Sequence, residues 1–222
     1  MSGAPRESGV RQAFRAMRSP GVTKFAPLAG IASGALAGAV YWLAVQLSPS
    51  SVALILSMLA GTLLTHDLDD DKRDHGKRDA GMRDAAAPRG IDTLGQLFYV
   101  LLKYNVLMAL SAAKLPFDAP PNTALCLIMI CGYGAARSMQ VCLLTTRPER
   151  AKAPLSHLDL GFALLLGFSP ALLLGMPGLI GLAAAVASAL ALSAAPRAAL
   201  MYAPWIVETC FYLGAQASWR YI

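Results

Sequence analysis

The sequence predicts an all-α protein, a multi-spanning transmembrane helical bundle of about seven helices. Hydrophobic residues make up 56% of its 222 residues and charged residues only 14%, about half the usual share in a soluble domain. A membrane-spanning helix needs about 20 mostly apolar residues, and seven stretches of the chain approach that length and composition. The expected spans are 26–47, 50–66, 94–114, 122–142, 157–175, 178–195 and 198–218.

The basic residues test this topology independently, because Lys and Arg collect on the inner side of short membrane loops. Most of the 19 Lys and Arg residues precede the first span or lie between the second and third or the fourth and fifth. These segments all fall on one side of the membrane. The net charge of +6 therefore reflects membrane topology, and no nucleic-acid partner is expected.

Two regions are expected along the chain: a basic N-terminal arm, residues 1–25, and a transmembrane domain, residues 26–222, which contains a cytosolic loop at 66–92. The arm is compatible with a mitochondrial targeting segment, and a juxtamembrane arm is the simpler alternative. The sequence predicts an integral membrane protein without distinguishing the mitochondrial inner membrane, the endoplasmic reticulum and a bacterial inner membrane.

A charged strip, HDLDDDKRDHGKRD at 66–79, interrupts the apolar chain. On a helix that continues the second span, four of its carboxylates would share one face, because their spacing is i, i+3, i+4, i+7. Gathered carboxylates repel each other, and Mg²⁺ would offset the repulsion while keeping coordination positions for substrate phosphates. The alternative is an ordinary polar loop between two spans. The four carboxylates belong to Asp67, Asp70, Asp71 and Asp74.

Polar side chains inside the third span are further candidates. Lys103 and Asn105 lie near its middle, where polar and ionisable groups are costly and often functional. The alternative for Lys103 is that its side chain reaches the membrane interface. His66, at the start of the strip, is compatible with binding a metal, binding an acceptor or capping the helix.

The strip resembles the first signature of the UbiA-type intramembrane prenyltransferases, which has the form N-D-x-x-D-x-x-x-D. Asp67, Asp70 and Asp74 fall on its three acids, and His66 replaces the leading Asn. Arg83 keeps its spacing in the basic loop that follows in the family. This signature is the specific part of the resemblance.

Other parts of the chain match that family less closely. The segments 15–20 and 27–30 are similar to its opening motifs, and the basic residues at 147–152 to an inner loop. The family's Pro and Gly after the strip are replaced by Asp84 and Pro88. The second acidic motif of the family is represented only by Glu208, with no aspartate after it.

The resemblance implies a Mg²⁺-dependent transferase that moves a polyprenyl group from an allylic diphosphate to an aromatic or related acceptor, in quinone, meroterpenoid or terpenoid biosynthesis. Asp67, Asp70 and Asp74 would be its catalytic and metal-binding residues, and Asp71 would be either an extra ligand or a solvated neighbour. Its partners would be a polyprenyl diphosphate, a phenolic acceptor and the lipid bilayer. The expected diphosphate-binding residues are Lys77, Arg78, Arg83, Arg147 and Arg150. Candidates to line a cavity for the prenyl group are Phe98, Tyr99, Tyr104 and Tyr133, with packing or anchoring at the membrane interface as the alternative role.

Three alternatives stay open. One is a terpene cyclase of the same family, and a second is an inactive homologue, which the missing second acidic motif favours. The third is a different enzyme class, such as cobalamin synthase or a CDP-alcohol phosphotransferase, since these also pair aspartates with membrane helices. The D-G-x-x-A-R signature of the phosphotransferases is absent from the sequence.

Overall fold

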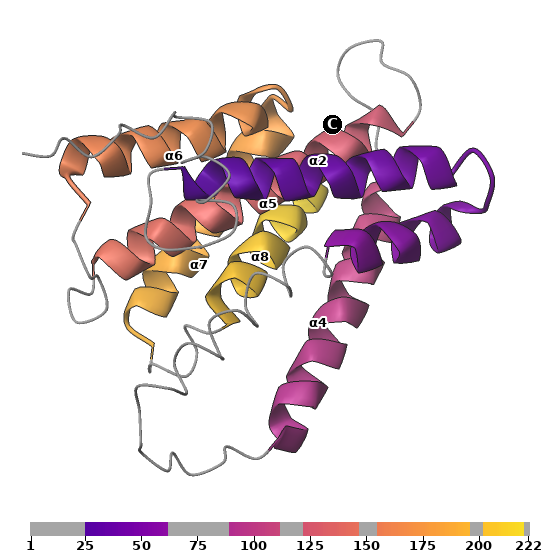
Figure 1. Ribbon diagram of the computed structural model, residues 1–222, viewed down its shortest axis with the longest axis horizontal. Helices are drawn as coiled ribbons and strands as arrows, with labels where there is room; N and C mark the ends of the chain where they lie inside the picture. The colour runs from indigo at the N-terminus through magenta and orange to yellow at the C-terminus, as the bar shows by residue number, and fades with distance from the viewer. Residues whose placement is uncertain (1–24, 62–88, 112–121, 147–154, 196–201, 220–222) are drawn as a thin grey trace, which may run out of the picture.

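The computed structural model describes residues 25–61, 89–111, 122–146, 155–195 and 202–219, and this part of the chain is helical with no strands. It contains seven helices, which confirms the predicted fold class, and each expected span corresponds to one of them (Figure 1). The helices are α2 (Ala26–Ala44), a helix at Ser50–Gly61, α4 (Arg89–Leu110), α5 (Thr123–Thr145), α6 (His157–Leu172), α7 (Met176–Ser193) and α8 (Ala203–Trp219).

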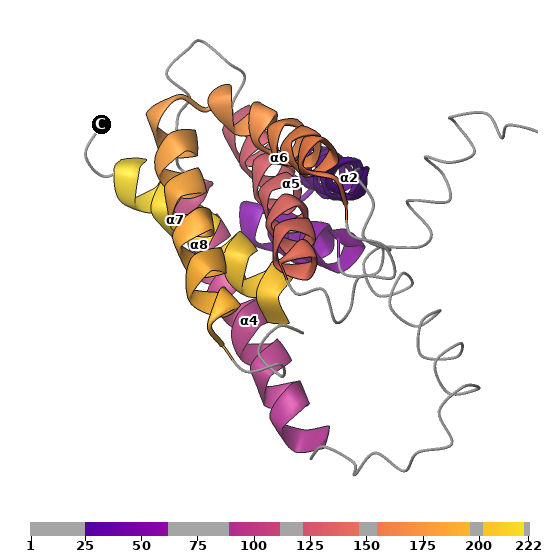
Figure 2. The ribbon, with the colours of Figure 1, turned by 90° about the vertical axis from the view of Figure 1, so that its left-hand side faces the viewer.

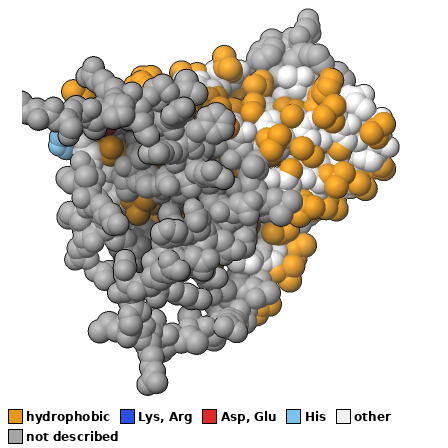
Figure 3. Space-filling view, viewed as in Figure 1, with side chains coloured by type: hydrophobic (Ala, Val, Ile, Leu, Met, Phe, Trp, Pro, Cys, Tyr) orange, Lys and Arg blue, Asp and Glu red, His pale blue; other side chains and the backbone are white. Residues whose placement is uncertain are grey.

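Three of the helices, α2, α5 and α7, are long and apolar enough to cross a membrane. Shorter apolar helices occupy Ser50–Gly61, Leu94–Leu110 and His157–Leu172. Apolar side chains dominate the described surface at the right of Figure 3. Large apolar residues such as Trp42, Leu43 and Ile55 are exposed. So much exposed apolar surface marks a membrane-embedded protein.

The central helix of the bundle is α5. Its buried residues extend from Ala124 to Leu143, and it contacts α2, α6, α7 and α8. In Figures 1 and 2, α5 lies between α6 and α8, with α2 against another of its sides. A side chain that α5 turns toward the bundle is therefore shielded from both water and lipid.

Small residues let α2 approach α5 closely. Gly30, Gly34 and Gly38 recur every four residues along α2 and therefore share one face. A Cβ atom on Gly34 would lie 2.7 Å from the Ile130 Cα of α5. This is the close backbone packing that small residues provide between membrane helices.

The α4 helix differs from its prediction at one end. It begins at Arg89 rather than near residue 94, so the expected cytosolic loop at 66–92 is too long by one turn of helix. This first turn is mostly polar, so a prediction based on apolar stretches does not include it in the helix. Both ribbon views show the N-terminal end of α4 projecting beyond the other helices (Figures 1 and 2).

Candidate functional site

The charged strip lies outside the described residues, and so do the basic residues expected to bind phosphate. The structure therefore leaves these candidates as predictions. They are His66, Asp67, Asp70, Asp71, Asp74, Lys77, Arg78, Arg83, Arg147 and Arg150. Gly61, at the end of the helix before the strip, and α4, which follows it, are both described.

Two other predicted candidates, Lys103 and Glu208, meet inside the bundle. Lys103 comes from α4 and Glu208 from α8. The Lys103 Nζ atom lies 2.5 Å from Glu208 Oε1, and the two side chains are only 3% and 5% exposed. The Lys103 side chain therefore does not reach the membrane interface, and its charge is paired with a buried carboxylate.

Two tyrosine hydroxyls complete the surroundings of Glu208. Tyr212, one turn further along α8, donates a hydrogen bond to Glu208 Oε1 at 2.8 Å. Tyr99 of α4 donates to the other oxygen, Oε2, also at 2.8 Å. Hydrogen bonds to a charged group are stronger than those between neutral groups. Both oxygens of the carboxylate are thus satisfied without water.

Lys103 has further partners on two helices. Its Nζ donates a hydrogen bond to the Tyr133 hydroxyl of α5 at 2.9 Å and lies 3.3 Å from the Tyr99 hydroxyl. The same Nζ sits 4.4 Å from the centroid of the Tyr133 ring, within the range of a cation–π interaction. We call Tyr99, Lys103, Tyr133, Glu208 and Tyr212 the Lys103 cluster.

Glycines and a tryptophan position the tyrosines of the Lys103 cluster. The Tyr212 ring lies against Gly132 and the Tyr133 hydroxyl against Gly61, so that a Cβ atom at either glycine would collide with the tyrosine. Trp205 of α8 stacks on Tyr99, with ring centroids 5.0 Å apart and planes at 14°. Tyr133 therefore touches both the helix before the charged strip and, through Lys103, the helix after it.

The chemistry of the Lys103 cluster is that of a closed network. Its charges are paired and its carboxylate oxygens are occupied, so it contributes one carboxylate rather than a set of metal ligands. Among the described residues, no group of three or more His, Cys, Asp or Glu side chains could hold a metal ion. The expected Mg²⁺ site thus depends on the strip, while the cluster joins α4, α5 and α8.

The remaining candidates of the third span lie elsewhere. Asn105 is exposed, and its Nδ2 donates to the Leu101 backbone carbonyl at 2.8 Å. Phe98 is 68% exposed, and Tyr104 packs against the core without being fully buried. Of the four aromatic residues expected to line a cavity, Tyr99 and Tyr133 instead belong to the Lys103 cluster.

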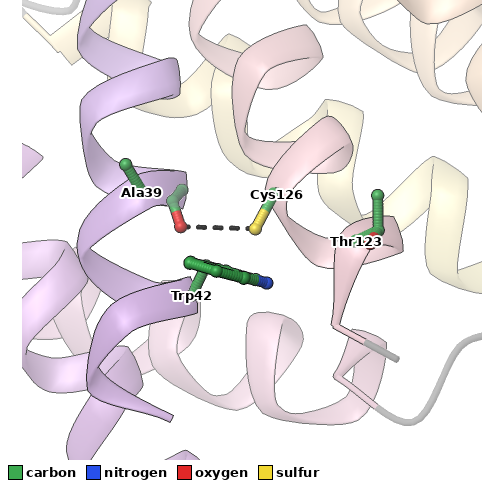
Figure 4. Close-up of a pocket in the computed structure, with 5 residues that line it drawn as sticks. Ala39, Trp42, Thr123 and Cys126 are labelled. Carbon is green, nitrogen blue, oxygen red and sulfur yellow. Dashed lines mark hydrogen bonds between the residues drawn. The ribbon is translucent and has the colours of Figure 1, made fainter. Parts of the chain in front are cut away.

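A shallow apolar pocket of about 290 Å³ lies between α2 and α5 (Figure 4). Its lining is Gly38, Ala39, Trp42, Thr123 and Cys126. The Cys126 Sγ donates a hydrogen bond to the Gly38 carbonyl at 3.3 Å, and the other polar side-chain groups of the lining are the Thr123 hydroxyl and the Trp42 indole N–H. Cys126 of the pocket lining precedes Tyr133 by seven residues on α5, which corresponds to about 10 Å along the helix axis. The pocket is separate from the Lys103 cluster.

Sequence reasoning missed Tyr212 and Trp205 as members of this site. Tyr212 follows Glu208 by four residues on α8, and residues so spaced lie on the same helix face. The available signal in the sequence was a tyrosine four residues after an acid within an expected membrane span. Trp205 had no comparable signal, because its contact with Tyr99 depends on how α4 packs against α8.

Residues 5–71 of the chain match the family model of cobalamin-5-phosphate synthase. The matched stretch is under a third of the chain, and it runs through α2 and the helix Ser50–Gly61 into the strip as far as Asp71. The match suggests an enzyme of the transferase class. No curated protein and no solved structure matches the chain.

This match corrects the resemblance drawn from the sequence. The matching family is a different membrane family from the UbiA-type prenyltransferases, so that identification was wrong. We therefore withdraw the activities expected from that resemblance, which were polyprenyl transfer and terpene cyclisation. The expected polyprenyl diphosphate and phenolic partners are withdrawn as well. The misleading feature was the acidic run after the second span, because spaced aspartates suit any membrane enzyme that binds a metal and a phosphate. The altered positions Asp84 and Pro88 already departed from the prenyltransferase pattern.

Proposed function

We propose that this protein is a membrane-embedded transferase that forms cobalamin 5-phosphate from cobalamin-related substrates, by a phosphoribosyl or nucleotide transfer. The observation that carries the proposal is the family match over residues 5–71. That stretch includes the close-packed α2 helix, the helix Ser50–Gly61 and the first six residues of the charged strip, 66–71. The membrane-embedded bundle supports it, since the match also concerns a membrane family.

The charged strip would be the reaction centre. Its carboxylates are hard oxygen donors, which fit Mg²⁺, and Asp67, Asp70 and Asp74 would hold the ion. When bound there, Mg²⁺ would act as a Lewis acid and balance the charge of substrate phosphates. Such a site suits the proposed product, because cobalamin 5-phosphate carries a phosphate group whose charge Mg²⁺ would balance. Basic side chains that would donate charge-assisted hydrogen bonds to phosphate oxygens are Lys77, Arg78, Arg83, Arg147 and Arg150.

The Lys103 cluster would position the helices on either side of this centre. The strip is joined to Gly61 on one side and to α4 on the other. Tyr133 lies against Gly61 and accepts a hydrogen bond from Lys103. A network that fixes both flanking helices against α5 supplies the rigid support that a reactive loop needs.

A genetic complementation experiment tests the proposal. The chain is expressed in a bacterium that requires cobalamin for growth and lacks its own cobalamin-5-phosphate synthase. We expect growth with the unaltered chain and none with Asp67→Asn or Asp70→Asn, each of which removes one proposed metal ligand. Asp79→Asn is the matched control, since it makes the same change in the strip at an acid outside the proposed ligand set.

Two outcomes would contradict the proposal. The first is a lack of growth with the unaltered chain when immunoblotting shows it in the membrane and an authentic synthase restores growth. The second is equal growth with all three aspartate variants, which would remove the strip from the reaction.

A further inference from the structure

The α4 helix has two opposite faces. One packs into the bundle and contains Lys103, Val106, Leu107 and Leu110, all at most 4% exposed. The other face is exposed, and along its middle five side chains are spaced alternately by four and three residues, with the exposed Leu97 and Ala109 at its edges. We call these five side chains the outer stripe of α4: Leu94, Phe98, Leu101, Asn105 and Met108. At about 100° per residue, Asn105 lies on nearly the opposite side of the helix from Lys103.

The spacing of the outer stripe is that of a coiled-coil seam. Alternating steps of four and three residues define the a and d positions of a heptad, which face a partner helix. Leu94, Leu101 and Met108 then occupy d positions, and Phe98 and Asn105 occupy a positions. A single Asn at an a position is known to fix the register and the number of helices in such a seam.

Asn105 gives this seam a polar group that lipid cannot satisfy. One N–H of its amide bonds to the Leu101 carbonyl, and its Oδ1 accepts no hydrogen bond from the residues that the structure describes. An unsatisfied amide in the hydrocarbon layer is costly. Lipid chains would cover the apolar side chains of the stripe but leave Asn105 Oδ1 and the second N–H of its amide without hydrogen-bond partners.

We propose that the outer stripe of α4 is a homodimer interface, in which Asn105 pairs with Asn105 of a second copy. Copies inserted in the same orientation bring their α4 helices together in parallel, so that each position of the seam faces its own equivalent. An amide has both donors and an acceptor, and two copies related by a two-fold axis can therefore exchange hydrogen bonds reciprocally. Interhelical amide hydrogen bonds of this kind stabilise helix association in membranes.

The first test measures association in liposomes. Copies labelled separately with donor and acceptor fluorophores are mixed at a series of protein-to-lipid ratios, and energy transfer reports the dimer. We expect Asn105→Leu to weaken association by roughly tenfold, because it removes the amide and retains an apolar helix former. Gln96→Leu is the control, since it removes an exposed amide from the same helix on a different side.

The second test maps the interface and leaves Asn105 intact. Leu101→Cys places a thiol in the seam, whereas Val100→Cys places one on the neighbouring exposed side of α4. On oxidation in membranes we expect a disulfide-linked dimer from Leu101→Cys above the background of the native cysteines, and none from Val100→Cys.

Any of three results would overturn the proposal. The wild-type chain could be monomeric at every protein-to-lipid ratio, which would mean that lipid covers the outer stripe. Association could be unchanged by Asn105→Leu, or the Leu101→Cys and Val100→Cys variants could cross-link equally. The proposal does not depend on the proposed transferase function.

Discussion

Lys103 Nζ and Glu208 Oε1 lie 2.5 Å apart inside the bundle and join α4 to α8. Neither charge reaches the surface, and three tyrosine hydroxyls occupy the hydrogen-bonding positions that remain around them. Taking two charges out of water is expensive, and the pair persists only because each group compensates the other. The stability of the bundle should therefore respond sharply when one partner is removed alone.

Replacing Lys103 by Met should leave Glu208 buried without its counter-charge. We expect a loss of about 3–5 kcal/mol, the usual cost of breaking a buried ion pair. The measurement is the unfolding of purified protein in detergent micelles, followed by circular dichroism. The double variant Lys103→Met/Glu208→Gln should recover most of the loss, because no uncompensated charge remains. Equal instability of the single and double variants would show that packing, rather than charge pairing, holds α4 to α8.

Tyr212→Phe removes one hydroxyl from the Lys103 cluster and keeps the ring against Gly132. The lost hydrogen bond goes to a charged oxygen, so we expect a destabilisation of about 1.5–3 kcal/mol. Tyr104→Phe is the control on α4, with an expected change of less than about 0.5 kcal/mol. Thermal melts of the two variants in the same detergent compare them directly. Similar melting temperatures would argue against the hydroxyl contact.

The close approach of α2 to α5 makes Gly34 sensitive to the smallest side chain. A Cβ atom there would lie 2.7 Å from the Ile130 Cα and 2.8 Å from the Met129 carbonyl oxygen. We expect Gly34→Ala to destabilise the protein by about 1–3 kcal/mol through overpacking. Gly161→Ala is the matched control in α6, where a Cβ meets nothing within 4 Å, and alanine there should stabilise the helix by up to about 1 kcal/mol. Equal effects of the two substitutions would contradict the packing.

The fold was largely predictable because length and hydropathy locate membrane helices almost by themselves. Each predicted span overlaps one observed helix, and the main error was the start of α4 at Arg89, where polar residues continue a helix beyond its apolar part. Such a turn carries no hydropathy signal, so composition alone misplaces it.

The candidate site was predictable only in part. Lys103 was singled out from the cost of a charge within a span, and the structure pairs it with Glu208 inside the bundle; its functional role stays a prediction. Glu208 was singled out through a resemblance that proved wrong, and its pairing with Lys103 depends on the packing of α4 against α8, which local sequence does not encode. The enzyme family was misjudged because spaced aspartates report a kind of ligand chemistry rather than a particular substrate.

The most direct test of the proposed function is product formation by the purified protein in lipid nanodiscs. The protein is incubated with the substrates of cobalamin-5-phosphate synthesis, with and without Mg²⁺, and the product is identified by mass spectrometry beside an authentic synthase. We expect cobalamin 5-phosphate only when Mg²⁺ is present and only when Asp67 and Asp70 are intact. If the folded wild-type chain forms no product under conditions in which the authentic synthase forms it, the proposed function is wrong.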